Sequence, residues 1–114
     1  MCYDFNLVIV IAHVGEARAI FNLSQFKEIR NSPFLTFRKN KTIIIISGEG
    51  RLRAAGAVSF VKALCEYKII FWLNIGCVGH RDCPIGTVVQ AGKIHDQEIN
   101  RSLFPSTPFK KNIP

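Results

Sequence analysis

The chain has 114 residues, of which 48% are hydrophobic, so it is long enough for one domain with a buried core and too apolar to be disordered. Its formal net charge of +7 at pH 7 favours anionic ligands in general. The basic residues are spread along the chain, without a basic helix, zinc-finger spacing or a basic strand interleaved with aromatic residues, which argues against nucleic-acid binding.

The first half of the chain predicts a strand, a helix and a hairpin. Phe5–Ala12 is a continuous apolar run rich in branched residues, which is typical of a strand buried on both faces. Gly15 breaks this run, and Glu16–Phe21 follows as a short helix with an acidic first turn. The segments Phe34–Arg38 and Thr42–Ser47 flank a short polar turn and predict a hairpin.

The second half predicts a longer helix and two further strands. Arg51–Tyr67 has one apolar face at helical spacing, with small residues that let it lie close to a sheet. Ile69–Ile75 reads as a buried strand with Trp72 in the core, and Ile85–Ala91 reads as another strand. The tail from about residue 97 to residue 114 carries several prolines and is expected to be irregular.

This order of elements predicts an α/β fold with a mixed central sheet in one domain, residues 1–114. The sheet would have about five strands and only two helices to cover it. Parallel strands need cover on both faces, so the chain reads as an incomplete domain, the first part of a larger one, and it is expected to expose apolar sheet surface and to form homo-oligomers.

Three loops follow three of the predicted strands. They begin at Ala12, Ser47 and Gly76 and run through Glu16, Arg51 and His80 respectively. Because ligands of open α/β sheets bind outside the carboxyl ends of the strands, these loops are expected to form one site.

Each loop also has a simpler interpretation. Ser47–Arg51 leads into a helix N-terminus, which attracts anions, but it lacks the P-loop and G-x-G-x-x-G patterns and reads equally well as an ordinary tight turn. Glu16 alone is better explained as a helix-start carboxylate, and His13 as either a ligand contact or a partly buried polar residue.

The cysteines at positions 2, 65, 77 and 83 form no C-x-x-C pair, and no secretory signal or membrane-spanning run is recognisable. We therefore expect free thiols in a cytoplasmic protein that has no membrane partner. Cys77 is more simply a buried thiol than a nucleophile activated by His80 or His13. A zinc site made by Cys77, His80 and Cys83 is less favoured still, so no metal is expected.

Taken together, the loops resemble the nucleoside phosphorylase superfamily, including its methylthioadenosine/S-adenosylhomocysteine nucleosidases. The resemblance covers roughly residues 5–96 and rests on three motifs in order: "IAHVGEARAIF", "SGEGRLRAAGAVSFV", and "LNIGCVG" followed by "IGTVVQAGKIHD". Each motif is weak alone, and their order and spacing make the match fairly specific.

The resemblance implies a three-layer α/β/α fold and cleavage of the N-glycosidic bond of a nucleoside, without a cofactor or a metal. It implies that Glu16 is the general base on water. It places the nucleoside, with phosphate as a further possible ligand, against the loop residues His13, Ser47, Gly48, Glu49, Gly50, Asn74, Gly76, Cys77, Val78 and Gly79.

Several positions depart from the family pattern. Asn74 and Cys77 stand where phosphate-using relatives carry an arginine and a hydroxyl, which favours hydrolysis over phosphorolysis. Glu49 stands where nucleosidases have an apolar residue near the ribose 5′ substituent, and Thr87 replaces a common aspartate.

The match also spans only the N-terminal half of the family's fold. The Met-Glu motif that grips ribose hydroxyls and the late aspartate that protonates the purine have no counterpart before Pro114. The alternative to an active enzyme is therefore a truncated, catalytically inactive domain that binds nucleosides or acts only in an assembly.

Overall fold

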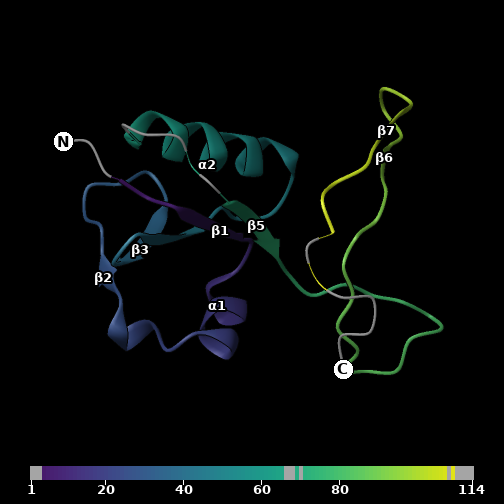
Figure 1. The fold of residues 1–114 in the computed structure, drawn as a ribbon, viewed down its shortest axis with the longest axis horizontal. Helices are drawn as coiled ribbons and strands as arrows, with labels where there is room; N and C mark the ends of the chain where they lie inside the picture. Colours follow the sequence, from purple (N-terminus) through teal and green to yellow (C-terminus); the bar gives the residue numbers. More distant parts are fainter. Residues whose placement is uncertain (1–3, 66–68, 70, 108, 110–114) are drawn as a thin grey trace. The chain divides into compact units, whose positions relative to one another are not determined.

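A computed structural model describes residues 4–65, 69, 71–107 and 109. Its chain divides into two units, Met1–Val78 and Gly79–Pro114, which are described in turn. The first unit contains, in chain order, β1 (Leu7–Ile11), α1 (Val14–Ile20), the 3₁₀ turn η1 (Leu23–Gln25), β2 (Lys27–Glu28), β3 (Leu35–Lys39), β4 (Thr42–Ile46), α2 (Arg51–Leu64) and β5 (Phe71–Ile75) (Figure 1).

The strands of the first unit form one mixed five-stranded sheet in the order β2-β3-β4-β1-β5, which confirms the predicted α/β class with a mixed sheet. β1 runs parallel to β4 and to β5, whereas β3 is antiparallel to β2 and β4. In this register Ile11 lies opposite both Ile46 and Ile75. The carboxyl ends of the three parallel strands therefore meet at one edge of the sheet.

The two helices pack on opposite faces of the sheet (Figure 1). On one face Ala57 and Val61 of α2 contact buried residues of β1 and β4. On the other face Ala17 of α1 joins Ile9 and Ile44 in a second apolar cluster. The strand order explains why the two helices lie on opposite faces. The connection from β1 to β4 and the connection from β4 to β5 run in opposite directions across the sheet. Right-handed crossovers then place their helices on opposite faces.

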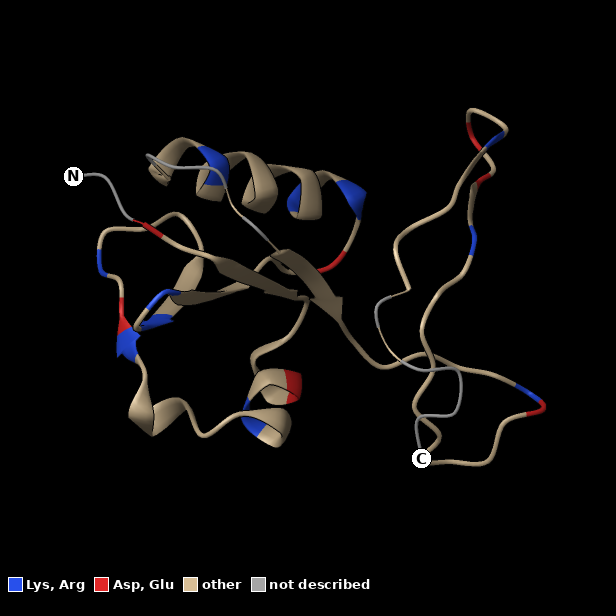
Figure 2. Cartoon of the chain, in the orientation of Figure 1, with Lys and Arg blue, Asp and Glu red and all other residues tan. Residues whose placement is uncertain are grey.

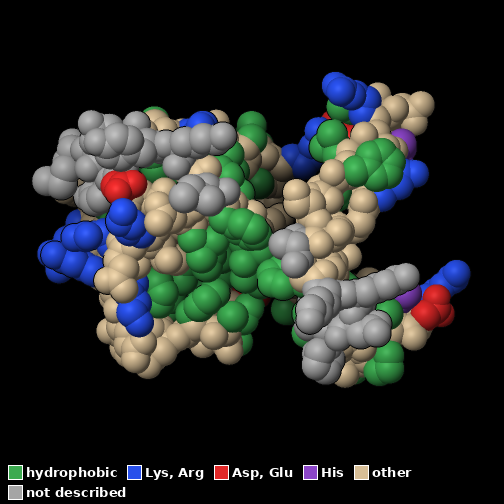
Figure 3. Space-filling view, in the orientation of Figure 1, with side chains coloured by type: hydrophobic (Ala, Val, Ile, Leu, Met, Phe, Trp, Pro, Cys, Tyr) green, Lys and Arg blue, Asp and Glu red, His purple; other side chains and the backbone are tan. Residues whose placement is uncertain are grey.

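β5 is an edge strand, so the prediction of a buried strand at this position was wrong. Its residue pattern is half exposed, and Phe71 and Trp72 keep 38% and 37% of their surface exposed. Trp72 is therefore not a core residue. Figure 3 shows apolar side chains gathered on the surface of the first unit that faces the viewer.

Other predicted boundaries also change. Gly15 lies inside α1 rather than before it. The long helix ends at Leu64, and residues 66–68 of its predicted end lie outside the described residues. The fifth strand of the sheet is the two-residue β2, which has too little pattern to be recognised, whereas Ile85–Ala91 forms no strand.

The second unit contains one two-stranded antiparallel sheet, β6 (Ile94–Asp96) with β7 (Arg101–Leu103). β7 lies within the segment predicted to be irregular, so that prediction was wrong at this point, and residues 108 and 110–114 of the tail lie outside the described residues. Within this sheet a ring nitrogen of His95 lies 2.9 Å from the hydroxyl of Ser102, and Asp96 is in register with Arg101. Among the described residues of this unit none is buried. No helix in the part of the chain described here has the length and apolar character needed to cross a membrane.

Candidate functional site

The loops after β1 and β5 meet at the carboxylate of Glu16. Its Oε2 accepts a hydrogen bond from the backbone N–H of Cys77 at 2.7 Å, and its Oε1 accepts one from the backbone N–H of His13 at 3.2 Å. Glu16 comes from the first turn of α1 and Cys77 from the loop beyond β5. The parallel pairing of β1 with β5 thus holds together residues that are 61 positions apart.

These bonds keep Glu16 ionised. The pKa of its carboxyl is lowered from the usual 4.5, chiefly by the hydrogen bond from the Cys77 backbone N–H. Partial desolvation acts in the opposite direction, and the Cys77 thiol and His13 lower the pKa further. Hydrogen bonds to a carboxylate favour its charged form. At neutral pH the site therefore contains an anionic carboxylate that can accept a proton, although the same bonds make it a weaker base.

The loop after β4 joins the same edge through Glu49. Its Oε1 lies 2.9 Å from Nε2 of His13, and both side chains remain accessible to solvent. β4 and β1 are adjacent parallel strands whose following helices cover opposite faces. Such a topological switch point is where open α/β sheets bind ligands. The structure therefore brings together the first two predicted loops and the part of the third loop, Gly76 to Val78, that lies in the first unit.

The backbone of the Ser47–Gly50 loop continues the pairing of β4 with β1. The N–H of Ser47 donates to the carbonyl of Ile11 at 2.9 Å, and that of Gly48 donates to the carbonyl of Ala12 at 3.1 Å. Ser47 is buried, and its hydroxyl donates to the Gly48 carbonyl at 2.9 Å. Ser47 thus shapes the turn, and its hydroxyl already has a protein partner.

Two glycines of this loop are required by the backbone. Gly48 has φ +84° and Gly50, the N-cap of α2, has φ +94°, in a region that side-chain-bearing residues rarely adopt. At Gly48 there is also a steric limit, since an added Cβ would lie 2.9 Å from Cδ of Arg53. The glycines of the second motif are therefore accounted for by the turn itself.

The turn geometry gives a test with a matched pair of glycines. Gly50→Ala is expected to lower the free energy of unfolding by about 1–3 kcal/mol through backbone strain alone, because nothing lies within 4 Å of the added methyl group. Gly15→Ala, in α1 and equally uncrowded, is expected to raise it by about 0.5–1 kcal/mol. Urea unfolding of both variants measures this, and equal losses would contradict the assigned φ at Gly50.

The loop after β5 contributes mainly backbone. Gly76 approaches Glu16 closely, and a Cβ there would lie 3.5 Å from Oε2, which is an ordinary contact. Asn74 lies in β5 in register with Val10 and is exposed, and Val78 is 75% exposed. Gly79 is the first residue of the second unit. The predicted residues of the third loop that the first unit contains thus lie at or next to the carboxyl end of β5.

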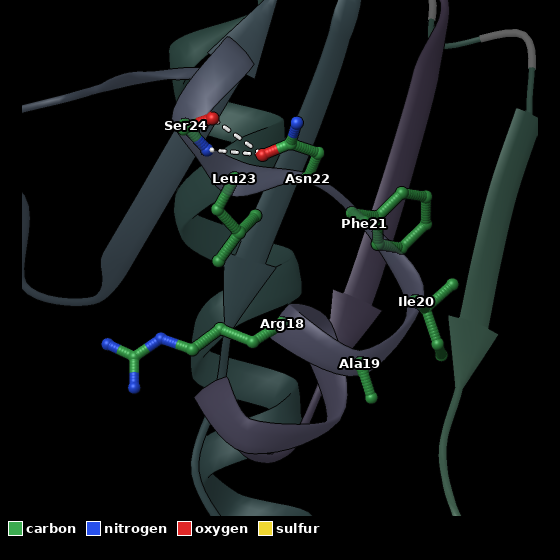
Figure 4. Close-up of a pocket in the computed structure, with 7 residues that line it drawn as sticks. All are labelled: Arg18, Ala19, Ile20, Phe21, Asn22, Leu23 and Ser24. Carbon is green, nitrogen blue, oxygen red and sulfur yellow. Dashed lines mark hydrogen bonds between the residues drawn. The ribbon is translucent and has the colours of Figure 1, made fainter.

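Two surface pockets have linings that do not include Glu16. One is formed by consecutive residues at the end of α1 and in η1, where the Asn22 side chain accepts hydrogen bonds from the backbone N–H and hydroxyl of Ser24 (Figure 4). The other lies beside the β3–β4 hairpin and includes Ser47, Gly48 and Arg53. The sequence reading missed Arg53, and its place in a helical pattern gives no signal that it faces Gly48.

The two cysteine hypotheses find no support in the geometry. The thiol of Cys77 hydrogen-bonds to the Glu16 carboxylate, whereas Nε2 of His13 contacts Glu49. Nδ1 of His80 instead accepts the backbone N–H groups of Asp82 and Cys83. Within the described residues, Cys65, Cys77 and Cys83 are free, and Cys77 is exposed, so the prediction of a buried thiol at this position was wrong. No group of three or more metal-binding side chains is present among these residues. Cys2 lies outside the described residues.

No protein-family model, no curated protein and no solved structure matches the chain.

Proposed function

We propose that this chain cleaves the N-glycosidic bond of a nucleoside by hydrolysis, with Glu16 as the general base. The observation that carries the proposal is the ionised Glu16 carboxylate at the edge where the loops after β1, β4 and β5 converge. A carboxylate there can take a proton from an attacking water. Residues 5–96 also carry the three motifs that resemble nucleosidases.

In the proposed reaction the bond between the sugar C1′ and the base nitrogen breaks, and its electron pair leaves with the base. Positive charge then develops on the sugar ring, as in other glycoside hydrolyses. Water attacks C1′ and gives its proton to Glu16. The bonds from His13 and Cys77 hold the carboxylate in a fixed orientation, which favours a positioned base over a mobile one.

The remaining loop residues are proposed to bind the nucleoside. Gly76 and Gly50 expose backbone without side-chain obstruction, and Asn74 can both donate and accept hydrogen bonds to the sugar or base. Water is favoured over phosphate as nucleophile because two carboxylates, Glu16 and Glu49, lie at this edge, and like charges repel an incoming anion.

The wider setting is also part of the proposal. We infer a cytoplasmic enzyme of purine nucleoside metabolism with a phosphorylase-type three-layer α/β/α fold. It would work as a homo-oligomer, without a cofactor or metal and without nucleic-acid or membrane partners.

The alternative function is a catalytically inactive domain that binds nucleosides or acts only in an assembly. Two observations favour it. Both oxygens of Glu16 already accept backbone hydrogen bonds, and neither of the surface pockets described above includes Glu16.

The two functions are separated by assaying release of free base from adenosine, with and without phosphate. Glu16→Gln keeps the shape of the side chain but cannot accept the proton, so the rate is expected to fall by about 10²–10⁴-fold. Glu28→Gln changes an exposed glutamate on β2 and is expected to leave the rate unchanged. Base release that is unaffected by Glu16→Gln would remove the role of Glu16, and binding without release would support the inactive domain.

A further inference from the structure

His13 is a second side chain at this edge that can transfer a proton. It is the N-cap of α1, and its own backbone N–H bonds to Glu16. The imidazole keeps 54% of its surface exposed although Nε2 lies 2.9 Å from Glu49, so a bound ligand can reach the ring. Imidazole is the side chain most often used for proton transfer near neutral pH.

We propose that His13 is the general acid that protonates the departing base, and that Glu49 is the residue that positions it. The inference rests on the N-glycosidic cleavage proposed above. The division of roles follows from charge, because Glu16 is ionised and can only accept a proton, whereas a protonated imidazole can give one. Sites that combine an acid and a base commonly place two such unlike groups side by side.

Glu49 acts on His13 through the contact between Oε1 and Nε2. A carboxylate at this distance accepts the Nε2–H, which fixes the plane of the ring. His13 and Glu49 both lie in loops, His13 after β1 and Glu49 after β4. Their contact therefore depends on the parallel register of the two strands, which sets Ile11 opposite Ile46.

The protons balance over one turnover. As the bond from C1′ to the base nitrogen breaks, the electron pair passes to the base and a ring proton of His13 passes to a nitrogen of the base. Water bonds to C1′ and loses a proton to Glu16. His13 is left neutral and Glu16 protonated, and exchange with solvent restores both.

The test compares two substrates that differ in their need for an acid. Adenosine has a poor leaving group that must be protonated, whereas p-nitrophenyl riboside releases a stable anion without protonation. His13→Asn is expected to slow adenosine cleavage by about 100-fold and cleavage of the nitrophenyl riboside by less than about threefold. Glu49→Gln is expected to slow adenosine cleavage by about tenfold through the same substrate-dependent effect. Glu16→Gln is expected to slow both reactions, because both need the attacking water.

His95→Asn is the matched control, because His95 is an exposed histidine of β6 in the second unit, and neither rate should change. Thermal unfolding of each variant checks that it folds, and His13→Gln replaces His13→Asn if that variant does not. Equal losses on both substrates, or no loss on adenosine, would overturn the acid role. Failure of the wild-type chain to cleave either substrate would overturn N-glycosidic cleavage itself, and the acid role with it.

Discussion

Replacing Ile45 with alanine is expected to lower the free energy of unfolding of the first unit by about 2–5 kcal/mol, the usual cost of deleting a large buried side chain. Ile45 has no exposed surface. It lies in β4 between Val10 of β1 and Thr36 of β3, in the apolar cluster that also contains Ala57 and Val61 of α2. The cavity would open between the sheet and α2, where neither the helix nor the strands can close it without shifting.

The loss matters because the total stability of a domain is about 5–15 kcal/mol, so the variant is expected to be partly unfolded at 37 °C. Urea unfolding can be followed by circular dichroism and by the fluorescence of Trp72, the only tryptophan. Ile20→Ala is the matched control, because Ile20 ends α1 with 52% of its surface exposed. It should cost less than about 1 kcal/mol, and equal losses would mean that the cluster on α2 is not a packed core.

The second large effect concerns the outer edge of β5, through which the isolated chain is expected to self-associate. The sequence of this strand, FWLNI, contains no charged residue and no proline. Charged residues and prolines usually protect an edge strand from pairing with another chain. Lys and Arg of the first unit gather instead on β2, β3 and α2 (Figure 2). Among the strands that the structure describes, none pairs with the outer side of β5. Light scattering is therefore expected to give a mass above the 12.8 kDa of one chain.

Trp72→Lys is expected to return the protein to a monomer, because a lysine on an edge strand costs little in the monomer but cannot be covered by another chain. Leu52→Lys is the matched control, since Leu52 lies on α2 with 87% of its surface exposed, and its association should match that of the wild type. A stable, monodisperse wild-type monomer would contradict the prediction.

Sequence patterns predicted the buried strands well because a strand that is buried on both faces consists almost entirely of apolar residues. The runs around Ile9 and Ile44 are apolar throughout, and the structure buries both residues. The same rule failed for β5, because FWLNI is as apolar as a buried strand and only the strand order shows that it lies at the edge. It failed again at Ile85–Ala91, whose β-branched pattern forms no strand in the structure.

Some features of the candidate site were also predictable from the sequence, and others were not. The convergence of three loops was predictable because parallel strands end at a common edge, and the structure places Glu16, His13 and Glu49 there. The hydrogen bond that orients Glu16 was not predictable, because its donor is the backbone of Cys77 and every residue except proline has the same N–H. The contact between His13 and Glu49 depends on strand register, which residue types alone do not specify.

The separation of 61 residues between Glu16 and Cys77 also has a consequence for synthesis of the protein. β1 and α1 leave the ribosome long before β5. During this time β1 lacks β5, one of its two parallel neighbours. At the usual rate of about 5–20 residues per second, Cys77 follows Glu16 by about 3–12 s. During this interval the bare side of β1 is open to other nascent chains, and the carboxylate of Glu16 lacks its shortest hydrogen bond. The site is thus completed in a late step of folding, and a chain that ends before β5 cannot form it.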